Sequence, residues 1–178
     1  MRTGDIKPLS DFDMHHLRAA QGWVELGNHV EADTELDKIV NEYHVHPDVL
    51  EVRWSIYESQ KHWEACVDIA EAIIGLDIER ANAWIHRSFA LHELKRTEEA
   101  LDRLKPASDM FPEIWNIPYN MACYCSQLGR LDECKEWFNR AMEIDEHSVK
   151  RAAIDDPDLK PLWDSMGGTV WKRCNDTT

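Results

Sequence analysis

Glycine and proline are scarce in this chain of 178 residues, which has seven of each. So few turn-forming residues argue against an all-β protein, which needs many tight turns between short strands. Cysteine is scarce too, and the odd count of five does not fit the paired framework of a small secreted disulfide domain. We therefore expect the protein to reside in a reducing compartment, the cytoplasm.

Long apolar runs are also lacking. No run approaches the roughly 20 residues that span a bilayer, and the N-terminal stretch MRTGDIKPLSDFDMHH lacks the apolar core of a secretory signal. Basic residues are outnumbered, since 20 Lys and Arg stand against 34 Asp and Glu, for a formal net charge of −14. Negative charge repels nucleic-acid phosphates and anionic membrane surfaces. We expect neither nucleic acid nor a membrane as a partner.

The sequence does contain an internal repeat. Hydrophobic residues make up 43% of it, enough for a core, and four stretches align in steps of 34 residues. These stretches are ELGNHVEADTELDKI (25–39), SQKHWEACVDIAEAI (59–73), ELKRTEEALDRLKPA (93–107) and QLGRLDECKEWFNRA (127–141). Small residues share one aligned position: Ala32, Cys66, Ala100 and Cys134. The alignment predicts four units at 13–46, 47–80, 81–114 and 115–148.

Each unit has the pattern of two helices separated by a polar break. The break is LGN (26–28) in the first unit and LGR (128–130) in the fourth. An acidic turn such as Glu98–Glu99 follows, which suits the start of a helix. In the second helices, apolar residues recur at helical spacing, as at Ala100, Leu104 and Ala107. We find no period-2 strand pattern, so the fold is predicted to be all-α.

A 34-residue helix pair with a small residue in the middle of its second helix resembles the tetratricopeptide repeat (TPR). The pattern is clearest in the third unit, with Trp84, Ser88, Leu91, Ala100, Leu104, Ala107 and Pro112, and the fourth ends in AMEID (141–145). Trp54 departs from it, because the family has a small residue there. The resemblance covers 13–148 and implies a right-handed α-solenoid of about four helix pairs. Residues 1–12 are then an N-terminal lead, 149–166 are capping helices and 167–178 are a flexible tail. The segment DPDLKPL (156–162) is similar to the tails that follow the last repeat in many bacterial TPR proteins.

The cysteines and histidines favour packing over chemistry. Cys66, Cys125 and Cys134 fall at inward-facing positions of the repeat, where a thiol serves as a small hydrophobe. Cys123 falls on the concave side and lies roughly 200° around the helix from Cys125, so the two do not share a metal. The pair His44 and His46 lacks further ligands at a recognisable spacing. We predict no metal, no cofactor and no enzymatic activity.

The resemblance also implies a binding surface, because stacked helix pairs expose their first helices on a concave face. In TPR proteins this face binds an extended peptide or a helix of another protein. Basic residues that hold a C-terminal carboxylate in some relatives are replaced here by Leu17, Asn82 and His86, so we reject that function. The candidate partner-binding residues are Glu51, Val52, Glu58, Ile85, His86, Phe89, Asn116, Tyr119 and Asn120.

These residues indicate the partner's chemistry. Val52, Ile85, Phe89 and Tyr119 form an apolar centre, and Asp48, Glu51 and Glu58 place acid at one end. We therefore expect a partner segment that is apolar and flanked by Lys or Arg.

Three interpretations remain open at this stage. The first is an adaptor or chaperone-like module that holds another protein in the groove. The second, from a different class, is a structural module that forms a homodimer through the ends of the array. In the third, the groove residues are a solvated surface that binds nothing. Exposed aromatic clusters favour a contact surface over the third interpretation.

Overall fold

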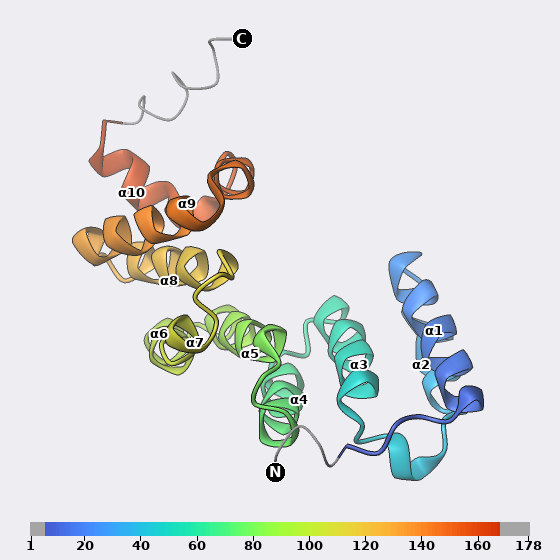
Figure 1. The fold of residues 1–178 in the computed structure, drawn as a ribbon. Coiled ribbons are helices and arrows are strands. Elements are labelled where there is room, and N and C mark those ends of the chain that lie inside the picture. Colours follow the sequence, from blue (N-terminus) through green and yellow to red (C-terminus); the bar gives the residue numbers. More distant parts are fainter. Residues whose placement is uncertain (1–5, 168–178) are drawn as a thin grey trace. The chain divides into compact units, whose positions relative to one another are not determined.

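The computed structural model describes residues 6–167, and every regular element in that range is a helix. The elements are α1 (Asp11–Glu25), α2 (His29–Leu36), the 3₁₀ turn η2 (Asn41–Tyr43), α3 (Pro47–Ser59), α4 (Trp63–Leu76), α5 (Ala81–Glu93), α6 (Thr97–Leu104), α7 (Ala107–Met110), α8 (Asn116–Gln127), α9 (Leu131–Ala153), the 3₁₀ turn η3 (Pro157–Leu159) and α10 (Lys160–Ser165) (Figure 1). The all-α prediction is confirmed. Most of the predicted lead at 1–12 is described, whereas all of the predicted tail except Gly167 lies outside the described residues.

The 34-residue period is visible in where helices begin. The second helix of each pair starts at His29, Trp63, Thr97 and Leu131, each 34 residues after the one before. The turn before each of these helices contains one residue in the left-handed region. These residues are Gly27 (φ 73°), Lys61 (57°), Lys95 (64°) and Gly129 (73°). Glycine adopts this conformation without strain, and lysine does not.

The chain divides into two compact units, Met1–Leu94 and Lys95–Thr178. The boundary falls in the turn between α5 and α6, so the predicted helix pair 81–114 contributes one helix to each unit. Each unit is described below by itself.

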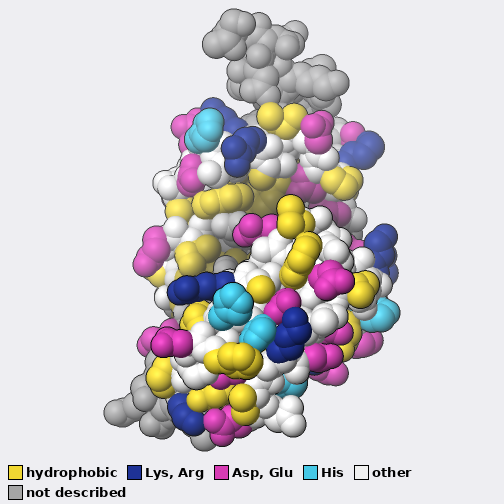
Figure 2. Space-filling model, turned by 90° about the vertical axis from the view of Figure 1, so that its right-hand side faces the viewer, with side chains coloured by type: hydrophobic (Ala, Val, Ile, Leu, Met, Phe, Trp, Pro, Cys, Tyr) yellow, Lys and Arg dark blue, Asp and Glu magenta, His cyan; other side chains and the backbone are white. Residues whose placement is uncertain are grey.

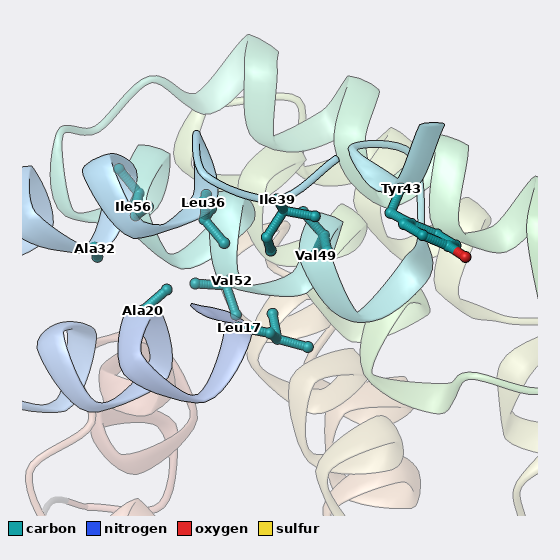
Figure 3. Packing of buried hydrophobic residues seen from close by; sticks show 9 residues of the cluster. All are labelled: Leu17, Ala20, Ala32, Leu36, Ile39, Tyr43, Val49, Val52 and Ile56. Carbon is teal, nitrogen blue, oxygen red and sulfur yellow. The ribbon is translucent and has the colours of Figure 1, made fainter. Parts of the chain in front are cut away.

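Unit 1 has a core built by its first three helices. Its buried side chains are Leu17, Ala20, Ala32, Leu36, Ile39, Tyr43, Val49, Val52 and Ile56. Figure 3 shows Val52 of α3 pointing toward Leu17 of α1, while Ala32 and Leu36 come from α2. A second cluster of Leu50, Ile73 and Ala83 joins α3 to α4 and α5. Burying one large aliphatic side chain stabilises a fold by about 1.5–3 kcal/mol, so these clusters hold α1–α5 together.

Unit 2 is built around the pair α8 and α9. Cys125 of α8 and Cys134 of α9 are both fully buried, as the packing interpretation of these thiols predicts, and so is Cys66 in unit 1. Helix α9 is kinked at Asp145 (φ −149°, ψ 86°), whose carboxylate accepts a hydrogen bond from the Ser148 backbone N–H at 3.0 Å. This bond restarts the helix after the kink, because it satisfies one of the free N–H groups of a helix start.

Beyond α9, the C-terminal segment, which contains η3 and α10, packs back on α8 and α9. Leu159 of η3 and Leu162 of α10 are buried, at 0% and 1% exposure. Trp163 packs edge-on against Phe138 of α9, with ring centroids 5.4 Å apart. The segment that the sequence assigns to a cap thus contributes apolar contacts to unit 2.

Candidate partner-binding cleft

The first helices of unit 1 form a cleft of about 430 Å³. Helices α1 and α3 each present side chains one turn apart, at i and i+4, to the same space. The lining residues are Gln21, Val24 and Glu25 of α1, Glu51, Val52 and Ser55 of α3, and His86 of α5. Glu51, Val52 and His86 are three of the nine residues proposed from the sequence. The other lining residues add polar acceptors and one more valine.

His86 is held in the cleft by an aromatic stack. Its ring lies parallel to that of Trp54, with centroids 3.8 Å apart and planes inclined by 8°. Burial lowers the pKa of His86 to about 4, so the imidazole is neutral at pH 7. Trp54, at the position where the repeat pattern has a small residue, therefore provides a flat surface that joins α3 to α5.

The acidic end of the predicted groove is partly compensated by one arginine. The Arg80 guanidinium contacts Asp48 Oδ1 at 2.6 Å, Glu51 Oε1 at 3.2 Å and Asp77 Oδ2 at 3.0 Å. A smaller pocket of about 220 Å³ lies beside it, lined by Glu51, Arg80, Ala81 and Asn82. The chain itself thus supplies one cation to Asp48, Glu51 and Asp77, which lowers the negative charge that this end offers to a partner.

Two other carboxylates on the first helices, Glu25 of α1 and Glu58 of α3, remain unpaired among the described residues. Neither Glu25 nor Glu58 forms an ion pair with another residue in the range 6–167. Burial raises the pKa of Glu58, which lies two helical turns from Glu51 on α3. Sequence reasoning missed Glu25 and Val24. Glu25 lies directly before the polar break at 26–28 and one turn after Gln21, a spacing that places Gln21 and Glu25 on one face of the helix.

Ile85 and Phe89 lie on α5 but do not line the cleft. Both are half-buried. The Phe89 ring packs edge-on against Trp63 of α4, with centroids 5.7 Å apart. Phe89 thus contributes to the α4–α5 contact, although the sequence suggested it as a central anchor.

The remaining predicted residues, Asn116, Tyr119 and Asn120, lie on α8 in unit 2. Asn116 and Asn120 are half-buried, and Tyr119 is buried at 6% exposure. The Tyr119 hydroxyl donates a hydrogen bond of 2.6 Å to Asp156 Oδ2. Burial and the neighbouring Cys123 and Asp156 raise the pKa of Tyr119. Tyr119 is thus bound to the C-terminal segment instead of forming an open surface.

The C-terminal segment covers the rest of this side of α8. Tyr119, Cys123 and Gln127 lie at i, i+4 and i+8, so they form one stripe. The Cys123 thiol also donates to Asp156 Oδ2, at 3.6 Å, and Gln127 Nε2 donates to the Asp158 carbonyl at 2.9 Å. Cys123 was expected on the concave surface, but it is only 4% exposed, because the turn at Asp156 lies over it.

The described residues offer little support for a metal site or for a nucleophilic cysteine. Among residues 6–167, no three His, Cys, Asp or Glu side chains are grouped so that they could hold a metal ion. Burial raises the pKa of the Cys66 and Cys125 thiols to about 11 and that of Cys134 to about 12, so they remain protonated and poorly nucleophilic. No helix within the same range is long and apolar enough to cross a membrane.

Helix pairs that repeat every 34 residues, with a cleft lined by their first helices, define a tetratricopeptide-repeat solenoid. TPR solenoids generally serve as protein–protein interaction modules. Residues 119–148 match the family model described as tetratricopeptide repeat, so this part of the chain is similar to such a repeat. No curated protein matches the chain by sequence.

Solved bacterial structures share the fold of the chain. PilF of Pseudomonas aeruginosa is 19% identical with a TM-score of 0.74, over 92% of this chain and 73% of that one. MamA of Desulfovibrio magneticus RS-1 is 15% identical with a TM-score of 0.71, over 96% and 100%. TTC0263, a TPR protein of Thermus thermophilus, is 17% identical with a TM-score of 0.70, over 87% and 83%. The chain therefore has the fold of small bacterial-type TPR proteins.

Proposed function

We propose that the protein is a non-catalytic adaptor or chaperone-like module that binds a peptide or helix of another protein through the concave side of its first helices. The partner segment is apolar with basic flanks. The observation that carries this proposal is the cleft of about 430 Å³ between α1, α3 and α5. Side chains from three successive helix pairs converge there, as a groove that binds an extended segment requires.

Charge and thiol chemistry support the same proposal. A net charge of −14 attracts basic segments over a distance and speeds their association. The described cysteines, Cys66, Cys123, Cys125 and Cys134, are all free thiols. Free thiols are the usual state in a reducing cytoplasm, where we place the protein.

The test uses a variant that fills the cleft without touching the core. Gln21 lines the cleft and is exposed, so Gln21→Trp places a large ring in the space with little cost in stability. Asn139→Trp, at an exposed position of α9 in unit 2, is the matched control. Partners captured by the wild-type protein are identified by mass spectrometry, and their affinities for the three proteins are measured by calorimetry.

We expect the partner to bind wild type and Asn139→Trp alike and to lose most of its affinity for Gln21→Trp. A partner that binds all three proteins equally would refute binding in the cleft.

Self-association is the second candidate, and two exposed side chains favour it. Leu26 and Val30 flank the α1–α2 turn and are 76% and 75% exposed. Apolar residues this exposed contribute to interfaces when they lie together. On the face drawn in Figure 2, however, hydrophobic side chains form small separate groups among charged ones. Sedimentation across a concentration series tests this candidate. A homodimer gives a mass that rises with concentration, and the rise disappears in Leu26→Gln with Val30→Gln.

A further inference from the structure

We propose that the cleft of unit 1 receives a single Lys or Arg side chain of the partner, whose aliphatic stem packs on Val24 and Val52 and whose charged head meets Glu25 and Glu51. This inference rests on the proposed function and specifies the recognition chemistry of the same site. The basic residues that flank the apolar segment of the partner thus include one whose side chain enters the cleft.

The lining of the cleft has the composition that a long basic side chain needs. Lys and Arg carry an apolar stem and a charged tip, and they bind best where both are matched. Val24 and Val52 provide apolar wall, whereas Gln21, Glu25, Glu51 and Ser55 provide oxygen acceptors. An apolar ligand would fill the same space without matching the Glu25 and Glu51 carboxylates, and it would displace part of their water, which is costly.

Two carboxylates line the cleft, and no Lys or Arg does so. The third ionisable lining residue, His86, is neutral at pH 7, because burial lowers its pKa to about 4. Glu25 is exposed and forms no ion pair within residues 6–167. The cleft therefore carries negative charge that a cationic side chain would neutralise.

Arg80 positions one of these carboxylates and leaves room for a second cation. It contacts Glu51 through Oε1 at 3.2 Å, and it lines the smaller neighbouring pocket instead of the cleft. The Glu51 carboxylate is thus held in place before any partner arrives. A preorganised carboxylate binds a guanidinium or ammonium group with a smaller loss of side-chain entropy.

The test uses small probes on the full chain, so that no partner needs to be known. The probes are acetyl-arginine amide, acetyl-lysine amide and the uncharged isostere acetyl-citrulline amide, titrated into ¹⁵N-labelled protein and followed by NMR. We expect the two cationic probes to shift the backbone amide signals of Val24, Glu25, Val52 and Ser55 saturably. Citrulline should bind about tenfold more weakly, as loss of one charge-assisted hydrogen bond predicts.

Matched variants assign the effect to the cleft. Glu25→Gln removes one carboxylate of the lining and should weaken the arginine probe by about tenfold. Glu143→Gln removes an exposed carboxylate of α9 in unit 2 and should leave the dissociation constant unchanged. Equal binding of arginine and citrulline, shifts confined to other surfaces, or an unchanged dissociation constant in Glu25→Gln would each overturn the inference.

The two proposals fail in different ways. If Gln21→Trp abolishes partner binding but neither the cationic probes nor Glu25→Gln has the expected effect, the cleft binds a partner of other chemistry, and only this inference is lost. If partner binding survives Gln21→Trp, the proposed function itself is wrong, whatever the probes do.

Discussion

The first helices of the two units use one position of the repeat in different ways. In unit 1, Gln21 of α1 and Ser55 of α3 line an open cleft, whereas Phe89, at the same position of α5, packs on Trp63. The equivalent residue of α8 in unit 2 is Cys123, whose thiol donates to Asp156 of the C-terminal segment. The same position of the repeat is thus part of a candidate binding surface in α1 and α3, but in α8 it is covered by the chain's own C-terminal segment.

The comparison shows that repeat register alone does not define a binding site. Tyr119 occupies a groove position by register, yet it is buried and its hydroxyl is satisfied by Asp156. Glu51 also occupies such a position, but it shares a cation with Asp48 and Asp77. What each position contributes depends on which other side chains reach it.

The largest effect should come from weakening the apolar contacts that the C-terminal segment makes with α8 and α9. Leu162 is 1% exposed, so Leu162→Ala should lower the free energy of unfolding by about 2–4 kcal/mol through loss of burial and a residual cavity. Urea unfolding followed by circular dichroism measures the change. Ile154→Ala, at a position 47% exposed, is the control and should cost less than about 0.5 kcal/mol. Similar losses of stability in both variants would show that the C-terminal segment does not pack on α8 and α9.

A pH-dependent contribution should belong to unit 1. The pKa of His86 is about 4 in the folded protein and about 6.5 when exposed, so below pH 6.5 the unfolded chain binds a proton that the native protein does not. The free energy of unfolding should therefore fall as the pH falls from about 6.5 to about 4, by up to about 3 kcal/mol.

Two variants isolate this contribution. His86→Phe preserves an aromatic ring against Trp54 and should remove that part of the pH dependence. His147→Phe, at an exposed position of unit 2, should leave it unchanged. Denaturation midpoints measured at intervals across this pH range decide the matter, and parallel curves for wild type and His86→Phe would contradict the assignment.

The hydrogen bond between Tyr119 and the C-terminal segment should contribute less stability than the apolar contacts of that segment. Tyr119→Phe removes the 2.6 Å hydrogen bond to Asp156 and should cost about 1–2 kcal/mol, because the bond has an ionised acceptor. Tyr57→Phe on α3 in unit 1, where the tyrosine is half-buried, is the matched control and should cost about 0.5 kcal/mol or less. Thermal unfolding of the three proteins tests this prediction. Equal melting temperatures would show that the Tyr119 hydrogen bond does not stabilise the C-terminal segment.

The smallest effects should arise in the turns within the repeats, where each unit contains one glycine and one lysine in the left-handed region. Lys61→Gly and Lys95→Gly should each raise the free energy of unfolding by about 0.5–1 kcal/mol, since φ values of 57° and 64° strain a residue with a Cβ. Gly27→Ala and Gly129→Ala, at φ 73°, should lower it by a similar amount. Urea midpoints test the series, and changes of the opposite sign would contradict the strain argument.

Local features of the fold could be predicted from the sequence because they depend on short segments. The second helices begin at the 34-residue intervals that the alignment indicated, and Cys66, Ala100 and Cys134 are buried at the shared small position. A repeat period and a helical spacing of apolar residues are properties of neighbouring residues, so a linear sequence contains them.

The candidate site depended on contacts between residues distant in the chain, which only the tertiary structure decided. Arg80 compensates Glu51 across 29 residues, and Asp156 covers Tyr119 across 37. Nothing in the local pattern of either partner predicts such a pairing, because a surface is open or covered according to what packs on it in three dimensions. By itself, the sequence determined where the helices and their buried faces lie. The packing decided which first-helix surface remains open and which of its charges remain unpaired.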